Sequence, residues 1–245
     1  VLVLSADSLI RFSPASNFNG TPGILNLNPL TQSNLDWATS DQPYGNREGF
    51  IVTWQSGDYR LSNSWSTEIY GQRFSSDGSK AGSEFLINTH TDNDQYNPSI
   101  TSLSDGGFVV IWRSNNQNGG DEDIYGQRFA ADGTKAGSEF LINTYISSRQ
   151  YHPAVSSLAD GGFVVTWESW YQDNSYYGIY GQRFSSDGSK SGNEFLINTY
   201  TDNYQQQPAV SSLSDGGFVV TWQSSNQDGS NWGVYGQRFS SDGSK

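Results

Sequence analysis

The stretch Phe163-Val164-Val165-Thr166-Trp167 recurs along the chain and decides how the rest of the sequence is interpreted. Close copies lie at 50–54, 108–112 and 218–222. The copies that begin at Phe108, Phe163 and Phe218 are 55 residues apart. Apolar side chains alternate with the two-residue period of a β-strand, which places Phe163, Val165 and Trp167 on one face. A fixed period of this length is typical of repeat proteins, in which each repeat is one supersecondary unit.

A second marker, Tyr180-Gly181-Gln182-Arg183-Phe184, has the same period, with copies at 70–74, 125–129 and 235–239. Each copy runs into a polar turn that ends on a lysine, and these residues are all the lysines of the protein: Lys80, Lys135, Lys190 and Lys245. Cutting the chain after each lysine predicts a divergent module at 23–80 and three regular modules at 81–135, 136–190 and 191–245.

One module contains four strand-like segments, which in the second module are Glu84–Asn88, Pro98–Leu103, Phe108–Trp112 and Ile124–Phe129. All are rich in β-branched and aromatic residues and are bounded by turn residues. The sequence Ser104-Asp105-Gly106-Gly107 predicts a tight hairpin, because Asp-Gly and Gly-Gly supply positive φ angles. Four antiparallel strands per repeat predict an all-β fold, a β-propeller with blades of about 55 residues.

The two ends of the chain suggest how such a ring could close. Residues 24–28 correspond to residues 85–89, and the last module ends without this strand. We therefore expect four blades in this chain, with the N-terminal strand completing the last blade and leaving no open sheet edge. Two chains forming eight blades, or a piece of a longer ring, are the alternatives. Residues 1–22 are expected to be a linker or the stub of a preceding domain.

Composition excludes several classes of protein. The 245 residues include no Cys and no Met, so disulfides, thiolate metal sites and a cysteine nucleophile are excluded. A formal net charge of −12 argues against nucleic acid and against an anionic membrane surface as partners. No apolar run reaches the roughly 18 residues that a membrane-spanning helix requires.

The segments 208–222, 235–239 and 194–198 together resemble repeats of very large secreted bacterial surface proteins, many of them RTX-type calcium-binding adhesins. The resemblance covers residues 23–245 and implies a secreted or cell-surface location. Residues 5–22 resemble the closing strands of cadherin-like or VCBS-type repeats from the same proteins. The glycine-aspartate nonapeptides that bind calcium in RTX proteins are missing from this sequence.

Calcium is the one cofactor that the sequence suggests. Ca²⁺ prefers six to eight oxygen ligands from carboxylates, amides and carbonyls. The segments 118–123, 92–94 and 202–203 supply such groups, and the candidate ligands are Asn118, Asp121, Asp123, Asp92 and Asp94. None of the segments matches an EF-hand loop, and solvated turns are the competing interpretation.

The variable loops at 55–68, 113–123, 168–178 and 223–233 are the best candidates for a binding surface. Strand-joining loops of this kind open on one side of a propeller. A sugar stacks its C–H face on an aromatic ring while its hydroxyls pair with amides and carboxylates. The candidate ligand residues are Trp65, Trp170, Tyr171, Tyr176, Tyr177, Trp232, Asn226 and Asp228. Packing of these rings against a neighbouring blade is the alternative.

Residues that repeat in every module are interpreted as structural. We predict that the tryptophans ending the repeated strand lie between blades: Trp54, Trp112, Trp167 and Trp222. The aspartates of the polar turns are expected to bond their own backbone: Asp77, Asp132, Asp187 and Asp242. The repeated arginines are expected to pair with neighbouring turns: Arg73, Arg128, Arg183 and Arg238.

Catalysis requires an asymmetric set of residues, and few unrepeated ones stand out. His90 and His152 are interpreted as surface loop residues. Glycoside hydrolysis would need two carboxylates, such as Glu168 with Asp121, Glu122 or Asp123, but nothing in the sequence places them together. We therefore predict that the protein is not an enzyme.

The sequence favours a non-enzymatic extracellular module for adhesion or surface assembly, whose partners would be cell-surface glycans or copies of itself. A carbohydrate-binding propeller lectin is the first alternative, and a glycan-cleaving enzyme is the remote one. Repetition discriminates among them, because a lectin predicts equivalent contacts in each blade whereas an enzyme predicts one odd blade.

Overall fold

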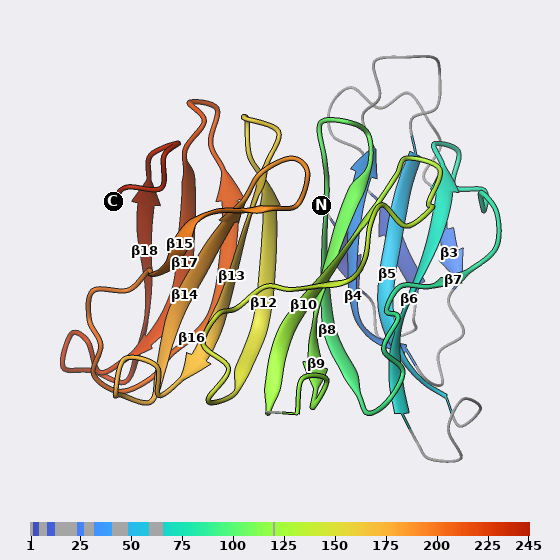
Figure 1. The fold of residues 1–245 in the computed structure, drawn as a ribbon. Coiled ribbons are helices and arrows are strands. Elements are labelled where there is room, and N and C mark those ends of the chain that lie inside the picture. The colour runs from blue at the N-terminus through green and yellow to red at the C-terminus, as the bar shows by residue number, and fades with distance from the viewer. Residues whose placement is uncertain are drawn as a thin grey trace.

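A computed structural model describes strands at 2–4, 9–12, 24–26 and 32–40 and, with side chains, residues 49–57, 66–119 and 121–245. All of its regular elements are β-strands (Figure 1). No helix in these ranges has the length and apolar character needed to span a membrane.

Four antiparallel sheets follow one another along the chain and lie side by side (Figure 1). Sheet I consists of β4 (Gln32–Ser40), β5 (Gly49–Asp58), β6 (Ser66–Ser75) and β7 (Phe85–Leu86). Sheet II consists of β8 (Gln95–Ser102), β9 (Phe108–Asn115), β10 (Glu122–Phe129) and β11 (Phe140–Leu141). Sheet III consists of β12 (Gln150–Ser157), β13 (Phe163–Trp170), β14 (Tyr177–Phe184) and β15 (Lys190–Leu196). Sheet IV consists of β16 (Gln205–Ser212), β17 (Phe218–Ser225) and β18 (Trp232–Phe239). The predicted all-β fold with four-stranded antiparallel sheets is confirmed.

Each sheet is offset by one strand from the module seen in the sequence. The Phe-Leu segment that opens a sequence module pairs with the Tyr-Gly-Gln-Arg-Phe strand before it, as Gly126 does with Phe140. That segment is therefore the outermost strand of the preceding sheet. The innermost strands, β4, β8, β12 and β16, each contact the next one along the chain.

The predicted closure by residues 24–28 is not found. The strand β3 (Ile24–Asn26) pairs with β2 (Leu9–Phe12), which pairs with β1 (Leu2–Leu4), and sheet IV remains three-stranded. Pairing with a neighbour a few residues away closes a short loop, whereas pairing with β18 would close a loop of some 200 residues at higher entropic cost. Sheets I and IV thus lie at opposite ends of the row in Figure 1.

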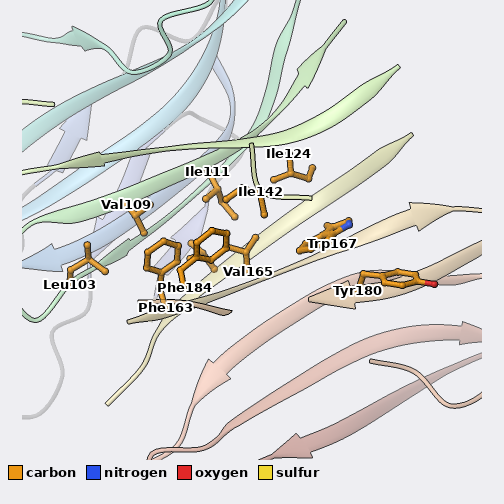
Figure 2. Close-up of a cluster of buried hydrophobic side chains, with 11 residues drawn as sticks. Leu103, Val109, Ile111, Ile124, Ile142, Phe163, Val165, Trp167, Tyr180 and Phe184 are labelled. Atoms are coloured by element: carbon orange, nitrogen blue, oxygen red, sulfur yellow. The ribbon is translucent and has the colours of Figure 1, made fainter. Parts of the chain in front are cut away.

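The hydrophobic core lies between successive sheets. Between sheets II and III, Val109, Ile111 and Ile124 of one sheet pack against Phe163 and Trp167 of the next (Figure 2). Equivalent clusters join sheets I and II and sheets III and IV. Burying aliphatic and aromatic faces in this way stabilises every sheet through its neighbours, as in other repeat proteins.

The Asp-Gly-Gly hairpins use their two glycines for different reasons. Gly161 has a φ of 86°, as expected for a tight turn. Gly162 is required by space instead, because a Cβ atom there would lie 2.2 Å from the carbonyl oxygen of Phe184. The second glycine lets the strands β13 and β14 approach each other.

Replacing Gly162 with alanine is expected to lower the free energy of unfolding by about 1–3 kcal/mol, because the backbone must shift to admit the methyl group. Gly57 is the matched control, since a Cβ atom there meets nothing within 4 Å. Urea denaturation of both variants checks this. Equal stabilities of Gly162→Ala and Gly57→Ala would contradict it.

Candidate functional site

Aromatic side chains gather where sheets III and IV meet, at the end of the strands that carries the 171–176 and 197–204 loops. We call the set Trp170, Tyr171, Tyr176, Tyr177, Tyr204 and Trp232 the aromatic strip. Tyr177 and Tyr204 form a parallel β-bridge, which holds the two loops together.

The rings of the aromatic strip contact one another in succession. The ring centroids of Trp170 and Tyr177 are 4.5 Å apart, and those of Tyr176 and Tyr204 are 4.6 Å apart and stacked. Tyr204 continues to Trp232 at 6.5 Å. Tyr171, Tyr176 and Trp232 are 47%, 40% and 51% exposed, so the strip presents large ring surfaces to solvent. Exposed rings held by their neighbours can bind a flat apolar ligand face at little cost in side-chain entropy.

The strip unites five of the residues predicted from the loops: Trp170, Tyr171, Tyr176, Tyr177 and Trp232. Trp65 lies outside the described residues. Asn226 and Asp228 form the β17–β18 turn, where the backbone N–H of Ser230 donates to Asp228 Oδ1 at 3.0 Å. Tyr204, which comes from a fourth-to-first strand loop, was missed.

Glu168 is a buried carboxylate beside the aromatic strip. Only 1% of this residue is exposed, and its Oε1 atom accepts a hydrogen bond from the backbone N–H of Gln207 at 2.6 Å. The same oxygen lies 2.8 Å from Nδ1 of His152. At the equivalent position, sheets I, II and IV carry Gln55, Arg113 and Gln223, so this acid breaks the repeat.

His152 reaches Glu168 because the innermost strand bulges. The register of β12 against β13 shifts between Tyr151 and Ala154, and His152 has a φ of 46°. Asn97 and Gln207 occupy the same bulge in sheets II and IV with φ of 51° and 57°. Asparagine and histidine are both among the residues that tolerate a positive φ.

A second carboxylate, Glu122, lies on the neighbouring sheet II. Its Oε1 atom is 3.6 Å from Arg113 Nε, and the guanidinium of Arg113 lies 4.4 Å above the ring of Tyr96 and 5.0 Å from the ring of Tyr151. Tyr151 also forms a side-chain hydrogen bond with Glu122. Arginine stacked between two rings holds this acid in place.

Tyr177 joins the acids to the aromatic strip. Its ring lies 5.9 Å from that of Tyr151. Burial first, and then the negative charges of Glu168 and Glu122, raise the pKa of the Tyr177 hydroxyl. Both carboxylates therefore act on one side chain of the strip. The structure brings Glu168 and Glu122 to one region, which sequence reasoning could not do.

Several of the predicted calcium ligands are engaged by other protein groups. Asp121 lies 3.3 Å from Arg149, and Asp123 is buried and accepts a hydrogen bond from Asn143 at 2.7 Å. Asp94 accepts a hydrogen bond from the backbone N–H of Thr67, and Asn118, which is exposed, forms a side-chain hydrogen bond with Asp123. Asp92 is exposed. Within residues 66–119 and 121–245, no three His, Asp or Glu side chains form a group that could hold a metal ion.

The repeated residues have structural contacts. The four tryptophans Trp54, Trp112, Trp167 and Trp222 are at most 5% exposed. Each turn aspartate accepts a hydrogen bond from the backbone N–H two residues on, at 2.9 Å: Asp77, Asp132, Asp187 and Asp242. Arg128 and Arg183 pair with hairpin aspartates, Arg238 does so with Asp215, and Arg73 donates to the Asp132 carbonyl. His90 is half-buried in the loop before β8.

Glu68 is a fully buried acid in sheet I whose oxygens accept hydrogen bonds from Asn88 Nδ2 at 2.6 Å and Ser66 Oγ at 3.1 Å. Burial raises the pKa of its carboxyl to about 7. The folded state therefore binds a proton that the unfolded chain has released above about pH 4.3, so stability falls as pH rises from there to 7. Asp123, the equivalent residue of sheet II, also has a raised pKa from burial.

Replacing Glu68 with glutamine is expected to raise the free energy of unfolding at pH 8 by about 2–3 kcal/mol, and to change it little near pH 4. Glutamine keeps an acceptor for Asn88 and has no charge to desolvate. Urea denaturation from pH 4 to 8.5 measures the difference. A constant offset between variant and wild type at all pH values would contradict the assignment.

Comparison with known proteins finds solved structures with a similar fold. No protein-family model and no curated protein matches the chain. Among solved structures, it is similar to the endo-arabinase of Bacteroides thetaiotaomicron, with 15% identity over 98% of this chain and 89% of that one and a TM-score of 0.53. The α-L-arabinofuranosidase of Fusarium graminearum, bound to an iminosugar inhibitor, is 12% identical over 89% of this chain and 65% of its own chain, with a TM-score of 0.62. The α-L-arabinanase of Penicillium chrysogenum, complexed with arabinobiose, is 14% identical over 98% of this chain and 72% of its own chain, with a TM-score of 0.59.

These likenesses contradict the prediction of a non-enzymatic module for adhesion or assembly, because these three structures with a similar fold are an arabinase, an arabinofuranosidase and an arabinanase. At such low identity they establish the fold and leave the activity to be argued from the site. The chain has a β-propeller-like all-β fold whose solved neighbours act on carbohydrates.

Proposed function

We propose that this protein is a glycoside hydrolase that cleaves a glycan chain bound along the aromatic strip. Glu168 and Glu122 are its two carboxylates. The observation that carries the proposal is Glu168, a buried acid that breaks the 55-residue repeat, contacts His152 and borders exposed aromatic rings. The arabinan-cleaving neighbours support arabinose-containing polysaccharides as the substrates to try first.

The reaction requires one proton donor and one base or nucleophile. A carboxylic acid protonates the leaving oxygen while the second carboxylate activates water or attacks the sugar carbon, and water completes the cleaved bond. Glu168 suits the second role, because donors already hold its Oε1 atom as an acceptor. Glu122, which pairs with Arg113 and is hydrogen-bonded by Tyr151 on the adjacent sheet, is left for the first role, and its ion pair must open before the carboxyl can carry the proton.

The aromatic strip suits the substrate. Tyr176 and Trp232 expose ring faces on which sugar rings can stack, and Tyr204 between them keeps the surface continuous. His152 stands with 41% of its side chain exposed, between solvent and Glu168. The resemblance of the repeats to secreted bacterial proteins supports a secreted or cell-surface location.

Release of reducing ends from a polysaccharide panel tests the proposal. Linear arabinan, branched arabinan, arabinoxylan and xylan are incubated with the protein, with and without millimolar Ca²⁺. We expect cleavage of at least one arabinose-containing polymer, with products shorter than the substrate on size separation. Binding without any release of reducing ends would overturn the enzymatic proposal.

A further inference from the structure

A guanidinium replaces a hydrogen-bond acceptor at the junction of sheets II and III. We propose that this guanidinium, from Arg113, and the backbone N–H of His152 bind the carboxylate of an acidic sugar. The assignment rests on the proposed glycan cleavage and makes glycans that contain uronic acid the substrate class.

The junctions on either side show what the acceptor does. The innermost strands of sheets II and IV bulge, and the N–H at each bulge donates to a side chain of the preceding sheet. The N–H of Asn97 donates to Gln55 Oε1 at 2.8 Å, and the N–H of Gln207 donates to Glu168 Oε1 at 2.6 Å. Residues 55, 113, 168 and 223 occupy the same position of the repeat.

Arg113 cannot accept such a bond, because a guanidinium has five N–H donors and no acceptor. The register of the innermost strand shifts at His152 as it does at Asn97 and Gln207. The φ of His152 is 46°, close to the 51° and 57° of the other two. The repeat therefore points the His152 N–H towards Arg113, so two donors meet where the other junctions have a donor and an acceptor.

Two tyrosines hold the Arg113 guanidinium in this position. It lies 4.4 Å from the centre of the Tyr96 ring and 5.0 Å from that of Tyr151, and 17% of the Arg113 side chain is exposed. Its buried Nε atom has no hydrogen-bond partner among the described residues, and Glu122 Oε1, at 3.6 Å, is beyond hydrogen-bond distance. A guanidinium fixed between two rings is a preorganised fork that matches the two oxygens of a carboxylate.

The surroundings of Arg113 indicate that the carboxylate belongs to a sugar. Arg113 pairs with Glu122, the proposed proton donor, and stacks on Tyr151, whose ring lies 5.9 Å from that of Tyr177 in the aromatic strip. A carboxylate bound by Arg113 places its sugar unit beside the proton donor. Neighbouring units of the glycan can then stack on the strip.

The bound carboxylate competes with Glu122 for one guanidinium. Two negative charges at this site repel each other, so binding of the acidic sugar favours the form of Glu122 that has taken a proton from solvent. The ion pair between Arg113 and Glu122 opens in the same step. Recognition of an acidic sugar and protonation of the proton donor therefore support each other.

Binding of matched monosaccharides tests the site without requiring cleavage. Methyl β-D-glucuronide and methyl β-D-glucoside differ in that the first has a carboxylate where the second has a hydroxymethyl group, and both are titrated into the full chain by calorimetry. We expect the glucuronide to bind about tenfold or more tightly than the glucoside, because of the charge-assisted bonds to Arg113. Acetate, the third probe, should bind about tenfold or more weakly than the glucuronide, since it has no sugar ring.

Arg113→Gln is the matched variant, because sheets I and IV carry glutamine at this position. The glutamine supplies an acceptor for the His152 N–H, as Gln55 does for Asn97, so the variant should fold. Its affinity for the glucuronide should fall about tenfold or more, while its affinity for the glucoside stays within about twofold.

Two further variants separate the fork from the general charge of the surface. Glu122→Gln removes the competing carboxylate and should raise the affinity for the glucuronide about threefold or more. Arg149→Gln removes an exposed cation that pairs with Asp121 and should change this affinity less than about threefold.

Equal affinities for glucuronide and glucoside, or for glucuronide and acetate, would overturn the assignment to an acidic sugar. So would an unchanged glucuronide affinity in a folded Arg113→Gln variant, or an equal loss in Arg149→Gln. These titrations involve no cleaved bond, so a failure of the carboxylate site is distinguishable from a failure of the proposed hydrolase, which the release of reducing ends reports.

Discussion

Replacing Glu168 with glutamine is expected to lower the rate of glycan cleavage by about 10²–10⁴-fold, the range typical for loss of a catalytic acid or base. Glutamine preserves the shape of the side chain and an acceptor for the Gln207 N–H, which donates to Glu168 at 2.6 Å. The free energy of unfolding should therefore change by less than about 1 kcal/mol. Initial rates on the best substrate of the panel, together with urea denaturation, measure both quantities.

Two variants complete this experiment. Glu84→Gln removes an exposed carboxylate far from the aromatic strip and should leave the rate unchanged. His152→Asn installs the residue that sheet II carries at the same bulge, Asn97, and should lower the rate by removing the imidazole that lies 2.8 Å from Glu168 Oε1. Unchanged cleavage by a folded Glu168→Gln variant would show that the catalytic site lies elsewhere.

Replacing Trp112 with alanine is expected to lower the free energy of unfolding by about 3–5 kcal/mol. The indole is fully buried between sheets I and II, where it packs with Ile51 and Ile100. Its Nε1 atom also donates to Gln95 Oε1 at 3.0 Å, so the variant leaves a cavity and an unpaired buried amide. Chemical denaturation with fluorescence detection measures the loss.

Trp232→Ala is the matched control, because this indole is 51% exposed and its truncation should cost less than about 1 kcal/mol. Trp112→Phe keeps part of the buried volume and should give an intermediate loss, which remains measurable if the alanine variant does not fold. Equal losses for Trp112→Ala and Trp232→Ala would contradict packing between sheets as the source of stability.

Sequence reasoning anticipated those parts of the fold that depend on local pattern. The two-residue alternation in Phe163–Trp167 and the turn residues at Asp160-Gly161-Gly162 specify strands and a hairpin, because side-chain direction and φ are local properties. Because the sequence repeats, the strands and hairpin predicted for one sheet were expected in the next sheet as well. The β-bulge that turns His152 towards Glu168 has no such local signal, since it repeats in sheets where the residue is Asn97 or Gln207.

In the candidate site, too, some features have a local sequence signal and others depend on how the sheets pack. Aromatic loop residues such as Trp170 and Tyr176 were recognised from composition, and Glu168 and Glu122 were named as possible partners. The approach of both acids to Tyr177 depends on how sheets II and III pack. The prediction of a non-enzymatic module was wrong on a different ground, the likeness of the fold to glycan-cleaving structures, which no local sequence pattern reveals. A hint was available, since Glu168 replaces the Gln or Arg of the other repeats.

The sequence by itself determined that the chain forms repeated antiparallel sheets with buried tryptophans and capped turns, because each of these features arises from residues within one repeat. The tertiary structure alone decided two things: that residues 24–26 pair with β2, and that Glu168 and Glu122 both act on Tyr177 of the aromatic strip. Each depends on distances between segments far apart in the chain. Residue pattern constrains such distances weakly, whereas packing and loop-closure entropy select among them.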